Sequence, residues 1–117
     1  MNVEDLLIYK QYIELINYTH SILLKFPKSE RFSLVEDIKV YTYSGLELII
    51  HSYKSYKKED KLKYLTELDV KLKLIKVFVR IAYKNKYISP KNYSAWSKKI
   101  ANICNLMGGW IKSCQKQ

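Results

Sequence analysis

Helix-breaking residues are scarce in this chain, and this scarcity limits its fold more than any other feature. The 117 residues include two prolines and three glycines. No stretch alternates strictly between apolar and polar residues over enough positions to form a β-strand. We therefore predict an all-α protein, and the length suits a single domain, residues 1–117, with one hydrophobic core.

Apolar residues recur at intervals of three and four in four segments, a spacing that places them on one face of an α-helix. The predicted helices span about residues 3–25, 34–57, 61–85 and 90–113. Ser89 and Pro90 suit the N-cap and first turn of the last helix, and Ser33 with Glu36 has the spacing of a capping box. Helices of similar length with short loops predict an antiparallel, up-down-up-down four-helix bundle.

The same spacing predicts which residues form the core. In the first helix they are Leu6, Tyr9, Ile13, Ile16, His20 and Leu23. In the third helix they are Leu65, Leu68, Leu72, Ile75, Val79 and Ala82, and in the fourth Tyr93, Trp96, Ile100, Ile103, Met107, Trp110 and Cys114. His20 is expected to be a hydrogen-bonded residue at the edge of this core.

The third predicted helix has two further faces. One is a second apolar stripe of Val70, Leu74, Phe78 and Ile81, and the other is a basic sector of Lys73, Lys76, Arg80 and Lys84. A four-helix core does not require so wide an apolar surface. The second stripe is therefore predicted to lie either under a neighbouring helix of the bundle or in an oligomer interface. Asp69 is expected to pair with a basic or backbone donor.

Small residues line one face of the fourth predicted helix, namely Ser97, Ala101, Cys104 and Gly108, with Gly109 beside them. A glycine inside a helix costs about 1 kcal/mol relative to alanine. The pair predicts that another backbone approaches closely or that the helix bends, and fraying of the helix at Gly108 is the alternative. Trp110 continues the apolar pattern past the glycines, which argues against fraying.

The chain has a formal net charge of +10, from 21 basic and 11 acidic residues. Residues 1–53 hold 5 basic and 7 acidic side chains, so the positive excess lies in the second half. This distribution predicts an anionic partner, with nucleic acid as the first candidate. All but two of the basic residues are lysine, and an AT-rich gene would explain that choice without explaining the shortage of acids.

Motifs for catalysis or metal binding are absent from the sequence. His20 and His51 lie on different predicted helices, and no glycine-rich phosphate loop, nucleophile elbow or Cys/His metal spacing occurs. Cys104 and Cys114 would lie about 15 Å apart on one helix, too far for a disulfide. We expect a cytoplasmic protein that is not an enzyme and has no metal, no cofactor and no membrane segment.

Four segments together carry a family resemblance: Phe26–Phe32, Leu68-Asp69, Tyr87–Ser89 and Gly108–Ser113. The last, Gly-Gly-Trp-Ile-Lys-Ser, is the most specific. In this order they resemble the Avd proteins, the accessory variability determinants of diversity-generating retroelements. The same family of small four-helix bundles includes proteins encoded in intervening sequences of bacterial large-subunit ribosomal RNA genes, and the final segment is more similar to the retroelement branch.

The resemblance implies a ring-shaped homopentamer without catalytic activity that binds the retroelement's reverse transcriptase, RNA and DNA, and supports mutagenic reverse transcription and retrohoming. The matching basic positions are Lys73, Lys76, Arg80, Lys84 and Lys112. Candidates for oligomer or helix packing are Val70, Leu74, Phe78, Ile81, Gly108, Gly109 and Trp110. Two other interpretations are a protein encoded in an rRNA intervening sequence and a basic helical module whose charge only keeps it soluble.

Overall fold

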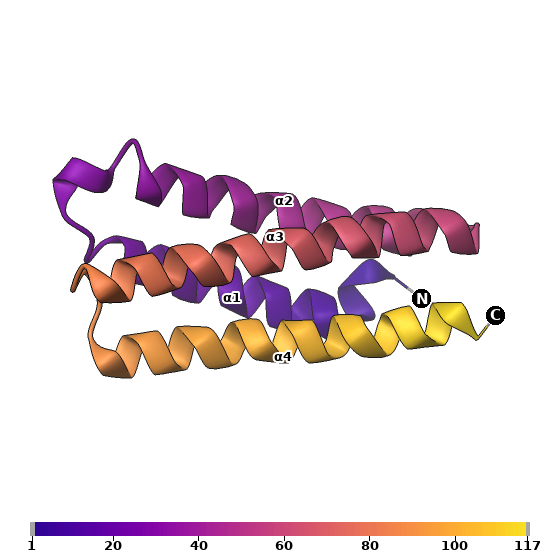
Figure 1. The fold of residues 1–117 in the computed structure, drawn as a ribbon. Helices are drawn as coiled ribbons and strands as arrows, with labels where there is room; N and C mark the ends of the chain where they lie inside the picture. The colour runs from indigo at the N-terminus through magenta and orange to yellow at the C-terminus, as the bar shows by residue number, and fades with distance from the viewer. Residues whose placement is uncertain (1, 117) are drawn as a thin grey trace.

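The computed structural model describes residues 2–116, which form four α-helices and two short 3-10 helices, with no strand in this range (Figure 1). The helices are α1 (Leu7–Leu23), α2 (Leu34–Lys54), α3 (Lys58–Lys84) and α4 (Pro90–Gln115), and the 3-10 helices η1 and η2 span Val3–Asp5 and Lys28–Glu30. Successive α-helices run in opposite directions along a molecule of 46 × 25 × 22 Å. The all-α prediction and the antiparallel packing of four helices are confirmed.

The helix ends differ from the predicted ones where the backbone becomes extended. The first helix begins at Leu7, not near residue 3, because Leu6 is extended, with φ −71° and ψ 134°. The second ends at Lys54 and the third already begins at Lys58, so a short link of residues 55–57 joins them. The fourth helix continues to Gln115, two residues further than predicted.

The two predicted helix starts have different outcomes. The Ser89 hydroxyl accepts a hydrogen bond from the Asn92 backbone N–H at 3.1 Å, and Pro90 follows in the first turn of α4, as predicted. Ser33 precedes α2, but its hydroxyl donates to the Glu30 carboxylate and accepts no hydrogen bond from the first turn of the helix. The capping-box prediction is therefore wrong in its hydrogen bonds and right in its position.

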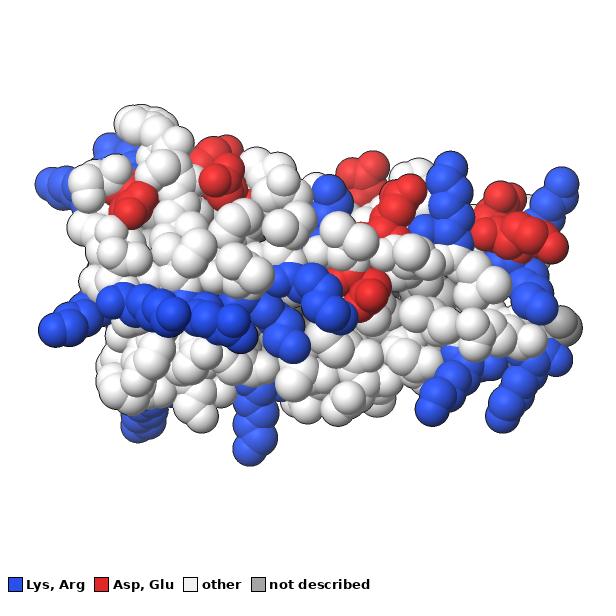
Figure 2. Space-filling model, viewed as in Figure 1, with Lys and Arg blue, Asp and Glu red and all other residues white. Residues whose placement is uncertain are grey.

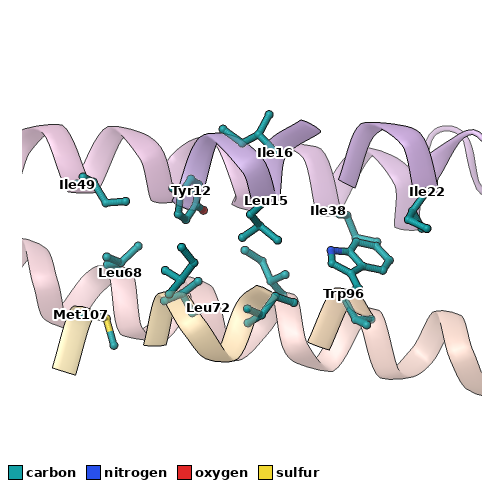
Figure 3. Close-up of a cluster of buried hydrophobic side chains, with 14 of the residues drawn as sticks. Tyr12, Leu15, Ile16, Ile22, Ile38, Ile49, Leu68, Leu72, Trp96 and Met107 are labelled. Carbon is teal, nitrogen blue, oxygen red and sulfur yellow. The ribbon is translucent and has the colours of Figure 1, made fainter. Parts of the chain in front are cut away.

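The core runs along the inside of all four helices (Figure 3). The predicted core residues of the third helix are all buried. Those of the fourth helix are buried as well, except for Tyr93 and Trp110, which are half-buried and pack against the core. The alternation of three and four residues therefore identified the inward faces of α3 and α4.

The inward face of α1 differs from the predicted one. Its buried positions are Ile8, Tyr12, Leu15, Ile16, Thr19, Ile22 and Leu23. Thr19 is inside because its hydroxyl accepts a hydrogen bond from the Trp96 indole N–H at 3.1 Å. His20 is exposed and hydrogen-bonds the Tyr43 hydroxyl, so it is hydrogen-bonded as expected but does not lie on the core face. The helix is apolar on two sides, and spacing alone did not identify the correct one.

Candidate nucleic-acid interface

A row of exposed cations follows the carboxyl-terminal half of α3. Lys76, Arg80 and Lys84 succeed one another at intervals of four residues, and all three are exposed. Figure 2 shows basic side chains in a continuous row over this part of the helix. None of the three forms a salt bridge within residues 2–116. At about 1.5 Å per residue, the row is roughly 12 Å long.

Lys73 extends this row, but its charge is paired. Its ammonium donates a hydrogen bond to the Asp69 carboxylate at 2.8 Å, and this bond raises the pKa of Lys73. The expectation that Asp69 pairs with a basic donor is thus confirmed. A phosphate that approached Lys73 would meet the carboxylate as well, so Lys73 contributes less positive potential than the three cations that follow it.

Cys104 of α4 lies beside the start of the row. Burial raises the pKa of its thiol, and the charges of Lys76 and Lys73 oppose that rise. Both cysteines are free, as their spacing predicts. With its pKa raised, the Cys104 thiol stays protonated at neutral pH and adds no negative charge to the basic row.

Lys112 is exposed and lies two turns of α4 beyond Cys104, roughly 12 Å along the bundle from the start of the row. The start of α3 lies beside the end of α4, where the Lys58 ammonium donates to the Gln115 carbonyl at 3.4 Å. The opposite ends meet where the rings of Tyr83 and Tyr93 stack at 4.2 Å. The 19 residues from Tyr93 to Lys112 separate Lys112 from the far end of the row by roughly 30 Å. Lys76, Arg80 and Lys84 therefore form one row, whereas Lys112 lies outside it, nearer to its Lys73 end.

The second apolar stripe of α3 is divided between the bundle and the surface. Phe78 is half-buried, with its ring 5.5 Å from that of Tyr41 on α2. Leu74 is also half-buried, whereas Val70 and Ile81 are 53% and 41% exposed. A neighbouring helix therefore covers Phe78, but the bundle leaves the outer part of the stripe uncovered.

The uncovered part of the stripe continues at Val77, which the sequence analysis did not single out. Val70, Val77 and Ile81 together form an outer apolar strip of α3. Val77 is 47% exposed. On a helical wheel it falls between the basic row and the pair formed by Val70 and Ile81. The sequence analysis did not assign Val77 to an apolar surface because basic residues of the predicted basic sector flank it in the sequence. The exposed side of α3 thus carries a basic row next to an apolar strip.

The two glycines of α4 lie in a continuous helix, so the alternative of fraying at Gly108 is wrong. A methyl group added at Gly108 or Gly109 would meet no atom within 4 Å. The described chain therefore contains no backbone that approaches either glycine. Trp110, the next residue, is half-buried and packs against the core.

Few other side chains in the described range are arranged for chemistry. In the described range, no three His, Cys, Asp or Glu side chains are placed to hold a metal ion. Nor does any helix between residues 2 and 116 combine the length and apolar character needed to cross a membrane. Exposed cations and exposed apolar side chains are thus the main features of this surface.

Comparison with known proteins relates the chain to one family and to solved structures of the same fold. Residues 6–114 match the family of proteins described as bAvd-like. The chain is also similar to a crystal structure of a protein of unknown function from the S23 ribosomal protein family of Bacteroides thetaiotaomicron, with a TM-score of 0.81 and 13% identity over 90% of this chain and 95% of that chain. At this identity the likeness shows the fold alone. No curated protein sequence matches the chain.

Proposed function

The chain belongs to the bAvd-like family, and from this membership we propose that it is a non-catalytic accessory protein of a diversity-generating retroelement. In this role it binds the reverse transcriptase and the template RNA or DNA through its basic surface, and so supports mutagenic reverse transcription and retrohoming. The observation that carries the proposal is the exposed, unpaired row of Lys76, Arg80 and Lys84 on a bundle of this family.

The row suits a phosphate backbone better than base edges. Its length of roughly 12 Å allows contact with two or three successive phosphates of a strand. Lysine ammonium groups bind phosphates as point charges and carry no sequence information. We therefore propose RNA and DNA binding with little sequence preference. Lys112, near the other end of the bundle, makes a separate contact that a longer strand or a neighbouring copy brings to the same ligand.

We also propose that the protein assembles into a homo-oligomer, with a pentameric ring as the form that the family resemblance implies. Two uncovered surfaces support assembly. The outer apolar strip of α3 contains Val70, Val77 and Ile81, and α4 presents Gly108 and Gly109 with open space beside them. Closely packed helices from two copies would bury both surfaces. A stable monomer across micromolar concentrations in light scattering would contradict the assembly.

Charge reversal on the row tests the nucleic-acid site. We expect the triple variant Lys76→Glu, Arg80→Glu and Lys84→Glu to keep its helicity and assembly size, because exposed substitutions usually change stability by within about 0.5 kcal/mol each. Binding to a labelled single-stranded RNA should nevertheless be lost at physiological salt. At lower salt, the slope of log affinity against log salt should fall by about 2 to 3, which corresponds to three lost phosphate contacts.

A matched control separates a site from net charge. Lys10, Lys25 and Lys57 are exposed and lie away from the row, and their reversal to Glu lowers the formal net charge from +10 to about +4, as in the first variant. The control should keep most of the RNA affinity and should still retain the reverse transcriptase in a pull-down. Equal loss of RNA affinity in both variants would show an effect of net charge. Unchanged RNA binding by the first variant would show that the row is not part of the binding site.

A protein encoded in an rRNA intervening sequence is the second candidate function. The observation that favours it is the shared fold with a member of the S23 ribosomal protein family. This candidate predicts RNA binding without retention of a reverse transcriptase. The presence of a reverse-transcriptase gene beside this one, and retention of its product in a pull-down carried out in parallel with the RNA titration, distinguish the two.

A further inference from the structure

A groove lies between α1 and α2 near the segment that joins them. The volume of the groove is about 710 Å³, within the range of about 300–1,000 Å³ that is typical of small-molecule sites. Leu23, Phe26 and Val35 line it and are buried, so part of its wall is apolar. The sequence analysis did not predict this groove, because its residues come from three separate segments of the more acidic half of the chain.

Three cations line this groove without an acidic neighbour in its wall. Lys28 and Arg31 come from the segment between the two helices and Lys39 comes from α2, while none of the described residues that line the groove is acidic. Glu30 of the same segment is engaged elsewhere. It accepts hydrogen bonds from the hydroxyls of Ser33 and Tyr87, which lower its pKa. The groove therefore favours an anion although its half of the chain carries no positive excess.

Aromatic and amide groups complete the lining. The Tyr43 ring is 47% exposed and contacts the His20 ring edge to face, with the ring centroids 5.7 Å apart and the planes at 72°. The hydrogen bond between these two side chains connects α2 with α1 at the groove. Asn17 adds an amide, which can both donate and accept hydrogen bonds. An exposed aromatic side chain and an amide are the groups that proteins use to hold a nucleobase.

We propose that this groove is a nucleotide site, separate from the basic row of α3. The phosphate binds to Lys28, Arg31 and Lys39, and the base lies against Tyr43 and the apolar wall. A fatty acid would also match the charge and the apolar wall, but it would leave the Asn17 amide without a role. The volume of about 710 Å³ suits one compact ligand better than a helix of a partner protein. The inference does not depend on the proposed function, since it uses none of the residues of the row.

Titration of the ¹⁵N-labelled protein tests the site with three probes: adenosine monophosphate, adenosine and inorganic phosphate. We expect saturable shifts at groove residues with the monophosphate, and binding about tenfold or more weaker with either of the other two probes, because each lacks half of the contacts. Absence of saturable binding by the monophosphate would overturn the proposal. Equal binding of inorganic phosphate would do the same, because it would reveal a general anion site.

Two groove variants separate the phosphate contacts from the base contacts. Arg31→Gln with Lys39→Gln should weaken binding of the monophosphate about tenfold or more. Tyr43→Ala should weaken binding of the monophosphate and leave the affinity for inorganic phosphate unchanged. The matched control, Lys10→Gln with Lys57→Gln, removes the same charge from exposed positions outside both the groove and the basic row, and should have no effect. The assignment would be refuted if the control variant bound the monophosphate as weakly as the groove variant does. It would also be refuted if an acidic peptide bound as tightly as the nucleotide.

Short oligonucleotides identify the source of the nucleotide. If the site takes the end of a strand, a 5′-phosphorylated oligonucleotide should bind the groove more tightly than its 5′-hydroxyl counterpart, and Arg31→Gln with Lys39→Gln should remove the difference. If the site takes a free nucleotide, the monophosphate should bind better than both. Neither result depends on the long-RNA titration of the row variant, so failure of the proposed function and failure of this site are distinguishable.

Discussion

Replacing Gly45 with alanine tests the tightest contact between α1 and α2. Tyr12 of α1 is fully buried, and its hydroxyl donates a hydrogen bond to the Thr42 carbonyl of α2 at 2.7 Å. A methyl group at position 45 would overlap the Tyr12 hydroxyl oxygen and lie 2.7 Å from the ring carbon Cζ. A ring enclosed on all sides cannot swing away, so the alanine would push the hydroxyl off its acceptor or move the helices apart.

Three effects set the magnitude of the change. A buried hydroxyl without its hydrogen bond costs about 1–3 kcal/mol. Overpacking of a close-packed core costs about 1–3 kcal/mol more. The higher helix propensity of alanine offsets about 1 kcal/mol of this loss. We therefore expect Gly45→Ala to lower the free energy of unfolding by about 3 kcal/mol and the midpoint temperature by more than about 10 °C.

Urea denaturation at a fixed protein concentration measures the effect, and Tyr12→Phe provides the control. The phenylalanine removes the oxygen with which the new methyl group would overlap. The loss caused by Gly45→Ala should therefore be at least about 1 kcal/mol smaller in the Tyr12→Phe background than in the natural chain. A Gly45→Ala protein that is more stable by about 0.5–1 kcal/mol, as at an exposed helical glycine, would refute the reasoning.

Three further predictions follow from single contacts. Thr19→Val removes the acceptor of the Trp96 indole N–H and should lower the free energy of unfolding in urea by about 1–3 kcal/mol. Tyr87→Phe removes one of the two hydroxyl donors that lower the pKa of Glu30, so an NMR titration should show a higher pKa for this carboxyl group. In the natural chain, the stabilisation that comes from the lowered pKa is present above the pKa of the unfolded state and is lost as the pH falls through the pKa of the folded state. The variant should therefore lose less stability in acid than the natural chain. Gly109→Ala meets open space and should stabilise α4 by about 0.5–1 kcal/mol, while light scattering should show a smaller assembly if another copy packs there.

The sequence predicts α3 and α4 better than α1, for a physical reason. The inward row of α3 is apolar at every position from Leu65 to Ala82, and the second apolar stripe of the same helix is shorter, so the longer row identifies the core face. In α1 the apolar residues surround much of the helix, and the buried polar residue Thr19 is explained only by its partner Trp96, which lies 77 residues away. Contacts between distant segments are not visible in the periodicity of one helix.

The candidate site was predictable to a similar extent. The spacing of Lys76, Arg80 and Lys84 fixes them on one sector of one helix, which the structure confirms as exposed. The distance from this row to Lys112 depends on the antiparallel order of α3 and α4. A resemblance between single positions of two sequences gives no information about that distance. The sequence analysis did not bring Arg31 and Lys39 together for the same reason, because only the packing of α1 beside α2 places them in the lining of one groove.

Stability and binding depend on different residues of this bundle, and the variants above can show this. Gly45 lies in the core between α1 and α2, whereas Lys76 and Arg80 project from α3 and share no contact with it, so their effects on stability should add. If the natural chain is stable by about 5 kcal/mol, a loss of about 3 kcal/mol still leaves roughly 97% of the molecules folded. Apparent affinity falls only in proportion to the folded fraction. Gly45→Ala should therefore bind RNA normally at 25 °C, while charge reversal of the row should abolish binding in a protein of normal stability. Loss of RNA binding by both variants would show instead that the row depends on the α1–α2 contact.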